Sequence, residues 1–312
     1  MRYQNQIHPE LRRIARRVPY NRAVIRCANL FLAAALRLTR VPADVTRAQI
    51  TLAGSGLPFR TEIFTPADAA GALPCLLYLH GGAFSYRASV HHKKLACLYA
   101  AQARCKVFFP DYHLAPKHPY PAAYQDALAL YRHLTAHAGA LGIDPEKIGV
   151  GGDSAGAALA ALVTNRCEQE ALPLPCLQML VYPVTDAAME TASMQKYTDT
   201  PLWNAKSTRR MWRCYGGGLD ASPMHDRLPR CIPDTYLETA EFDCLRDEGA
   251  LYGEKLRAAG ARVTRNDTRG TFHGYDAALG TSVAAESIRR RVSFLRQAFG
   301  GAKFVDSGEK AW

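Results

Sequence analysis

Residues 147–157 read Lys-Ile-Gly-Val-Gly-Gly-Asp-Ser-Ala-Gly-Ala, and the rest of the fold can be worked out from this stretch. The apolar residues Ile148 and Val150 predict a short strand, and the alanine-rich segment 157–163 predicts a helix directly after it. Gly-x-Ser-x-Gly between a strand and a helix is typical of a nucleophile elbow, a sharp turn that raises a serine hydroxyl above the sheet edge. The glycines on both sides let strand and helix pass closely. The pattern alone also fits an ordinary turn, but these flanks favour Ser154 as a nucleophile.

The composition is that of an ordinary globular protein. The chain has 312 residues, of which 48% are hydrophobic and 21% charged, enough for one α/β domain with a smaller appendage. Its nine cysteines are odd in number, form no Cys-x-x-Cys pair and lie partly in apolar runs. We therefore expect a reducing compartment, with neither a disulfide framework nor a zinc site.

The positive charge is concentrated near the N-terminus. Residues 1–47 contain ten arginines against Glu10 and Asp44, a net charge of 10 − 2 = +8, within a total of +11 for the whole chain. Such a segment suits an anionic membrane or an acidic substrate. A solvated helix face is the simpler interpretation, and no nucleic-acid reader motif accompanies the arginines.

The N-terminal apolar stretch does not predict a membrane span. The uncharged run 27–36 is shorter than the about 20 residues that cross a bilayer. The 26 residues before it, rich in arginine, do not resemble the layout of a signal peptide. We expect a cytoplasmic protein with no integral membrane span.

Strands and helices alternate along most of the chain. Apolar residues at helical spacing predict helices over 7–18 and 24–38. Strands are expected at 61–65, 74–80, 106–112, 176–182, 235–240 and 262–266, and helices at 90–103, 122–138, 248–259 and 283–299. This alternation predicts an α/β fold with a mostly parallel sheet and helices on both faces. Only residues 184–225 interrupt the rhythm.

A serine nucleophile needs a base, and the base needs a group that orients it. Among ten histidines, His273 stands out because it follows the last strand in a glycine-flanked loop. With this type of elbow the chain order is serine, acid, histidine, so the acid should lie between residues 154 and 273. Asp243 directly follows a predicted strand, where such sheets place catalytic groups. Asp186 and Asp276 are its rivals.

Backbone N–H groups are also needed where carbonyl charge develops. Residues 80–84, His-Gly-Gly-Ala-Phe, follow an apolar strand, and two glycines allow the backbone to approach a bound ester closely. The N–H groups of Gly81, Gly82 and Ala155 are the expected oxyanion hole. An ordinary glycine turn is the alternative.

Taken together, these motifs resemble the hormone-sensitive lipase family of α/β-hydrolase carboxylesterases, the bacterial family IV type. The likeness extends over about 60–280. Residues 80–82 match His-Gly-Gly-Gly, 152–156 match Gly-Asp-Ser-Ala-Gly, 111–123 resemble Asp-Tyr-Arg-Leu-Ala-Pro-Glu-His-x-x-Pro-Ala-Ala, and 241–249 and 272–274 match the acid and base segments. The resemblance implies a cofactor-free, metal-free carboxylesterase with a helical cap, acting on short- to medium-chain esters through an acyl-enzyme.

The resemblance also implies a division of the chain. Residues 1–47 would be N-terminal cap helices and 184–225 a cap insertion. Residues 48–183 and 226–300 would form the α/β-hydrolase catalytic domain, and 301–312 a C-terminal tail. Apolar residues of the N-terminal helices, among them Val18 and Phe31, are expected to line or support the substrate entrance. Ala83 departs from the family pattern: it replaces the third glycine, adds a methyl group and restricts φ.

Other functions on the same scaffold stay open at this point. A sugar-ester deacetylase, an amidase or a thioesterase would use the same triad. A non-catalytic receptor of the gibberellin-receptor kind lacks the catalytic histidine, so His273 favours an enzyme. The expected partner is a small-molecule ester and not a nucleic acid, while the sequence leaves a homodimer undecided.

Overall fold

The computed structural model describes residues 3–300 of the chain. Its strands are β1 (Val45–Ala53), β2 (Pro58–Pro66), β3 (Leu73–Leu79), β4 (Lys106–Pro110), β5 (Ile143–Asp153), β6 (Leu177–Val181), β7 (Asp234–Phe242) and β8 (Val263–Phe272). Its α-helices are α1 (Arg22–Leu38), α2 (Val90–Ala103), α3 (Ala122–Ala136), α4 (Ala155–Arg166), α5 (Ala192–Lys196), α6 (Ala205–Tyr215), α7 (Arg246–Ala258) and α8 (Ser282–Ala298). Short 3-10 helices are η1 (Pro9–Leu11), η2 (Gly218–Ala221), η3 (Pro223–His225) and η4 (Tyr275–Ala277).

One eight-stranded sheet runs through the molecule in the order β1-β2-β4-β3-β5-β6-β7-β8. The pairs β1–β2 and β2–β4 are antiparallel, and every pair from β4–β3 to β7–β8 is parallel. The expected α/β fold with a mostly parallel sheet is confirmed. The carboxyl ends of the parallel strands therefore meet at one edge, which is where such sheets carry their sites.

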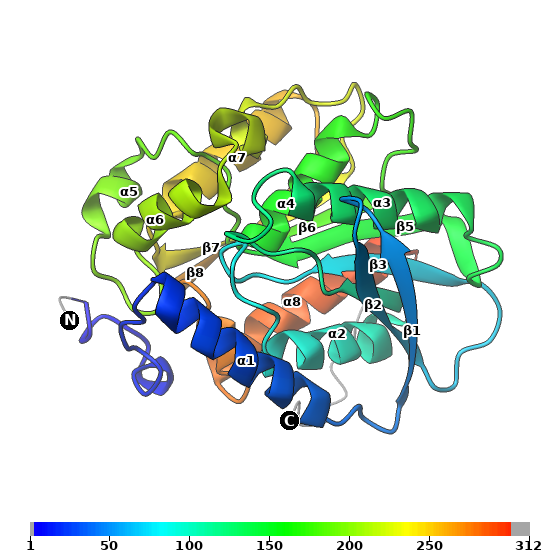
Figure 1. The fold of residues 1–312 in the computed structure, drawn as a ribbon, viewed down its shortest axis with the longest axis horizontal. Coiled ribbons are helices and arrows are strands. Elements are labelled where there is room, and N and C mark those ends of the chain that lie inside the picture. Colours follow the sequence, from blue (N-terminus) through cyan, green and yellow to red (C-terminus); the bar gives the residue numbers. More distant parts are fainter. Residues whose placement is uncertain (1–2, 301–312) are drawn as a thin grey trace.

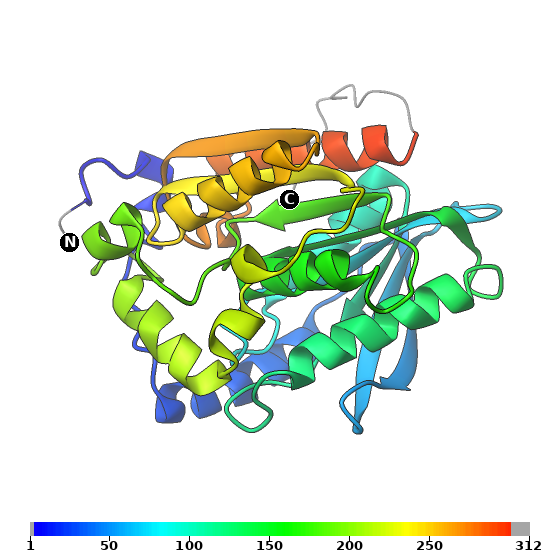
Figure 2. The same ribbon diagram turned by 90° about the horizontal axis from the view of Figure 1, so that it is seen from above.

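Helices cover both faces of the sheet (Figure 1). On one face α2 packs against β2, β4 and α8, and α1 lies outside α2. On the other face α4 packs on β5 and β6, with α3 and α7 beside it. Figure 2 shows α5 and α6 beyond the ends of the central strands, on the side where the N-terminal segment also lies.

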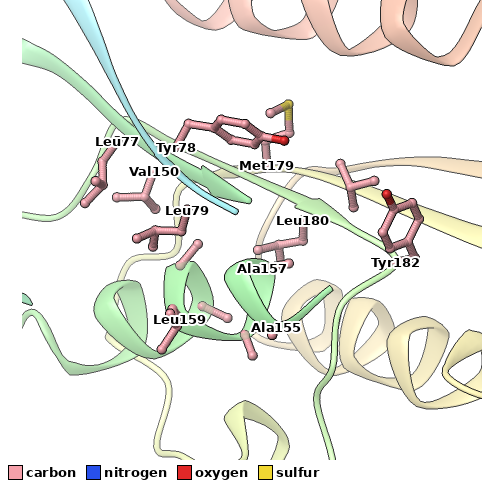
Figure 3. Close-up of a cluster of buried hydrophobic side chains, with 14 of the residues drawn as sticks. Leu77, Tyr78, Leu79, Val150, Ala155, Ala157, Leu159, Met179, Leu180 and Tyr182 are labelled. Atoms are coloured by element: carbon pink, nitrogen blue, oxygen red, sulfur yellow. The ribbon is translucent and has the colours of Figure 1, made fainter. Parts of the chain in front are cut away.

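Buried hydrophobic side chains form the core beneath the elbow (Figure 3). Val150 and Leu180 point from the sheet toward α4, and Tyr78 and Met179 point to the opposite face. This follows from the alternation of side chains along a strand. Every residue of α4 from Ala155 to residue 165 is buried, so this helix is apolar on all sides because it is covered on all sides.

The N-terminal region differs in part from expectation. Residues 7–18 do not form a continuous helix, since only η1 and turns occur there. Backbone groups of this segment bond to distant parts of the chain instead: the His8 N–H donates to Gly270 O of β8 at 2.8 Å, and the Arg16 carbonyl accepts from the Leu202 N–H at 2.8 Å. The second expected helix is α1, and its Phe31 is 74% exposed.

Two other expectations concern boundaries. The strand β1 begins at Val45, so the division expected at residue 47 falls inside it. The expected tail 301–312 lies outside the described residues. Among those described, no helix combines the length and the apolarity needed to cross a membrane.

Candidate active site

Ser154 lies between β5 and α4 in a strained backbone conformation. Its φ is 54° and its ψ is −118°, which a residue with a side chain adopts only where the surroundings force it. A Cβ on either Gly152 or Gly156 would overlap the carbonyl oxygen of Leu79, so both positions must be glycine. The Ser154 N–H donates to Val181 O at 2.8 Å. The turn thus has the geometry that the Gly-x-Ser-x-Gly pattern predicts.

His273 connects Ser154 to Asp243. The His273 Nε2 is 2.8 Å from Ser154 Oγ, and its Nδ1 is 2.7 Å from Asp243 Oδ2. The other oxygen of the fully buried Asp243 accepts the Leu245 N–H at 3.0 Å. Because a carboxylate only accepts, we assign the proton to Nδ1, which leaves Nε2 to accept from the serine hydroxyl. This is the arrangement that activates a serine.

The rival carboxylates are engaged elsewhere. Asp186 accepts from His225 Nε2 at 2.8 Å and from the Ala188 N–H at 2.8 Å. Asp276 is buried in an ion pair with Arg291 at 2.6 Å. The structure therefore brings Asp243 to the histidine.

The segment 80–84 approaches the elbow from the end of β3. Gly82 has φ 124°, a conformation suited to glycine, and Ala83 has φ 55°, which costs an alanine some strain. The Gly82 carbonyl accepts from the N–H groups of Ser85 at 2.9 Å and Tyr86 at 2.7 Å. Within residues 3–300 the N–H groups of Gly81 and Gly82 donate no backbone hydrogen bond that would occupy them.

A buried network beneath the elbow was not foreseen from the sequence. Asp153 accepts from Tyr78 Oη at 3.0 Å and from His92 Nε2 at 3.0 Å. Because His92 Nδ1 accepts the Ser89 N–H at 2.9 Å, the ring proton lies on Nε2. Burial works to raise the pKa of Asp153, but His92 and the neighbouring His91 and His80 together lower that pKa below its usual value. Asp153 is thus a buried carboxylate that ties the end of β5 to Tyr78 of β3 and His92 of α2.

His80, the first residue of the segment 80–84, stays neutral. His80 is fully buried, and burial lowers its pKa to about 4, with the neighbouring His92 acting in the same direction. Its Nδ1 is 2.6 Å from Gly81 O, and Tyr112 Oη donates to His80 O at 2.6 Å. These bonds hold the start of the segment.

Aromatic rings form the wall around His273. The ring of Tyr182 is 4.7 Å from the His273 ring, and that of Trp203 is 6.2 Å away. Trp203 belongs to the 184–225 segment, and Tyr20 of the N-terminal segment contacts it edge-on at 5.5 Å. Tyr20 Oη also bonds Ser85 Oγ at 2.8 Å. Trp203 of the 184–225 segment therefore borders His273, and Tyr20 of the N-terminal segment packs against Trp203. No cluster of His, Cys, Asp or Glu suited to a metal ion occurs among residues 3–300.

Comparison with known proteins agrees with this fold. A family model described as "alpha/beta hydrolase fold" matches residues 76–277. Carboxylesterase NlhH of Mycobacterium tuberculosis is 34% identical over 248 residues, 76% of this chain and 77% of that protein. Ethyl acetate hydrolase of Pseudomonas putida is 35% identical over 234 residues, 71% of this chain and 72% of that protein.

Solved structures give the same result. A bacterial heroin esterase superposes with a TM-score of 0.86 at 29% identity, covering 95% of this chain and 98% of that one. Esterase LipW of Mycobacterium marinum superposes with a TM-score of 0.85 at 30% identity, covering 95% and 97%. The chain belongs to the α/β-hydrolase family. Within it, the chain is a carboxylic ester hydrolase of the hormone-sensitive lipase type.

Proposed function

We propose that this chain hydrolyses carboxylic esters with short or medium acyl chains through an acyl-enzyme on Ser154. The observation that carries the proposal is the continuous chain of contacts from Asp243 through His273 to Ser154, at 2.7 Å and 2.8 Å. A receptor on the same fold does not need this series of contacts between carboxylate, imidazole and hydroxyl. An ester hydrolase requires it to activate its serine.

In the first half of the reaction, Ser154 Oγ attacks the ester carbonyl carbon while His273 Nε2 takes the hydroxyl proton. The carbonyl oxygen becomes an oxyanion, to which the N–H groups of Gly81, Gly82 and Ala155 donate. As the tetrahedral intermediate collapses, the carbon–oxygen bond to the alcohol breaks and His273 gives its proton to that alcohol. Asp243 keeps the imidazole in the required tautomer throughout.

In the second half, water replaces the alcohol. His273 Nε2 takes a proton from water, whose oxygen attacks the acyl carbon. Collapse of the second intermediate breaks the bond to Ser154 Oγ, which regains its proton. The carboxylic acid leaves, and none of these steps uses a cofactor.

The cap would consist of the N-terminal region and residues 184–225. The contact between Tyr20 and Trp203, beside His273, supports this division, since it closes the site with side chains from both regions. Such a cap limits water at the site and positions the acyl or alcohol group. The crowded rings favour small acyl groups, and a relative is named for ethyl acetate.

The test is a panel of nitrophenyl esters of increasing acyl length, run on the full chain and on Ser154→Ala. We expect turnover to be highest on short or medium chains, and to fall by a factor on the order of 10⁴ to 10⁶ in the variant at unchanged melting temperature. Near-normal turnover in a folded Ser154→Ala variant would show that Ser154 is not the nucleophile. Faster hydrolysis of the matching anilides or thioesters would instead favour the amidase or the thioesterase.

A further inference from the structure

The helix α1 is apolar on two opposite faces. Its inner face carries Ile25, which is only 4% exposed, and packs against α2. On the same side Asn29 bonds the backbone directly after residues 80–84, the oxyanion segment: its Nδ2 donates to Ser85 O at 2.8 Å, and its Oδ1 accepts the Arg87 N–H at 2.9 Å. The inner face of α1 therefore packs against the catalytic domain.

The outer face is the unusual one. An exposed stripe recurs at spacings of three or four residues and consists of Ala23, Cys27, Leu30, Phe31, Ala34 and Leu38. We call it the outer α1 stripe. Leu30, Phe31 and Leu38 are 70%, 74% and 82% exposed, and they are half of the six large apolar side chains exposed within residues 3–300. A helix at the surface of a globular protein normally places charged and polar residues there.

Positive charge borders this stripe on one side. At 3.6 residues per turn, Arg22, Arg26 and Arg37 fall along one edge of it. The helix contains no acidic residue. Figure 2 shows α1 at the edge of the molecule. Exposed Leu and Phe beside arginines are the composition of helices that lie in a membrane interface.

The same edge opens into a basic cleft of about 1230 Å³ between α1, the β1–β2 hairpin and residues 109–118. Its charged lining consists of Arg22, Arg26, Arg37, Arg47, Arg60, Arg87, Lys117, Glu62 and Asp111. Glu62 pairs with Arg47, and Asp111 pairs with Arg87. The other five of the seven cations that line the cleft have no carboxylate of the cleft lining as a partner. Leu57, another exposed apolar residue, also lines the cleft. No residue of the Ser154 triad does.

We propose that the outer α1 stripe and the basic cleft dock the protein on an anionic lipid surface. Phe31, Leu30 and Leu38 enter the boundary between headgroups and acyl chains, and the arginines contact lipid phosphates. The charge argues against a second copy as the occupant. A twofold pairing through the stripe would bring the arginines of both copies together with no acid from either helix. The inference concerns binding and does not depend on the esterase reaction.

Flotation of the full chain with vesicles tests this directly. We expect binding to vesicles of phosphatidylcholine mixed with phosphatidylglycerol, and little to phosphatidylcholine alone. Binding should weaken as salt rises from about 0.1 M to about 1 M, because the Debye length falls from about 10 Å to about 3 Å. Equal binding to both vesicle types, or none to either, overturns the proposal.

Variants separate the two contributions. Phe31→Ser should lower the vesicle partition coefficient roughly tenfold or more through lost apolar burial. Arg26→Gln with Arg37→Gln should lower it about fivefold for each arginine. Matched controls are Leu251→Ser, an exposed leucine (55%) on α7 across the sheet, and Arg230→Gln with Arg257→Gln, which remove the same charge elsewhere. Both controls should bind as the parent does.

The remaining outcomes are also decisive. Melting curves show whether each variant is folded, and the exposed positions make unfolding of Phe31→Ser unexpected. If the controls lose binding as much as the α1 variants, the effect is one of net charge or general hydrophobicity, and the site is rejected. If Phe31→Ser instead converts a dimer into a monomer in sedimentation, the stripe is a self-interface and the proposal fails.

Discussion

The α-carbon of Gly81 lies against the carboxylate of Asp153, so closely that an added Cβ would overlap Asp153 Oδ2. Asp153 is itself fixed from below by Tyr78 and His92, at 3.0 Å each. The oxyanion segment and the elbow are thus two sides of a single contact. Neither backbone can shift without moving the other.

Gly81→Ala should therefore damage catalysis. The methyl group forces the segment away from Ser154, and we expect kcat to fall by about 10²-fold or more, since loss of one oxyanion donor has that effect. Gly139→Ala is the matched control, because its Cβ would meet nothing within 4 Å. Steady-state kinetics on a nitrophenyl acetate decide: equal kcat values in the two variants would mean that Gly81 does not position the oxyanion hole.

The identity of the acid can be tested by comparing two substitutions. Asp243→Asn should cost on the order of 10⁴ in kcat, since an amide in contact with Nδ1 favours the wrong tautomer of His273. Asp186→Asn should stay within a few-fold, because Asp186 bonds His225 and not His273. The reverse ranking would assign the orienting role to Asp186.

A buried glutamate should make stability depend on pH. Glu248 is fully buried and accepts from the N–H groups of Thr185 at 2.8 Å and Asp186 at 3.2 Å, and burial raises its pKa well above 4.5. The folded state therefore retains a proton that the unfolded state loses near pH 4.5. Stability is fully present below that pH and falls as the pH rises toward the folded pKa.

Glu248→Gln should remove this dependence. The free energy of unfolding of the variant, relative to the parent, should rise by about 1.4 kcal/mol per pH unit above about pH 4.5 until the folded pKa is reached. Urea unfolding at a series of pH values measures it. Exposed Glu146→Gln serves as the control for loss of a carboxylate. Parallel curves for parent and Glu248→Gln would show that Glu248 is already ionised in the folded state.

The site was predictable because its signals are local. Ser154, Asp243 and His273 each directly follow a strand, so strand pattern and chain order indicated that these three side chains meet, as their contacts show. The contact of Asp153 with His92 had no such signal. His92 lies within an ordinary helix 61 residues earlier in the chain, and only the folded sheet brings the two together.

The N-terminal region shows two things that the spacing of apolar residues cannot predict. The spacing of Ile7 and Leu11 correctly indicates burial, since both are buried. The backbone between them nevertheless forms only the short η1, and the His8 N–H donates to Gly270 O of β8. In α1 both faces are apolar, so the pattern predicts a helix without saying which face packs inward. Phe31 lies on the exposed face, which the pattern could not distinguish from the packed one.

The inner face of α1 provides the last prediction, through Asn29. Asn29→Ala removes the two hydrogen bonds to Ser85 and Arg87 that tie α1 to the backbone directly after the oxyanion segment. We expect kcat on small soluble esters to fall about tenfold, because a small displacement of positioning groups is enough to slow the reaction. The control is Asn21→Ala, which deletes the α1 cap on the Val24 N–H at 3.0 Å and costs about 1 kcal/mol of stability. If α1 acts through the segment, Asn21→Ala keeps kcat within twofold while the melting temperature of both variants falls. If kcat falls equally in both, the helix contributes only stability, and the N-terminal region is no part of the catalytic cap.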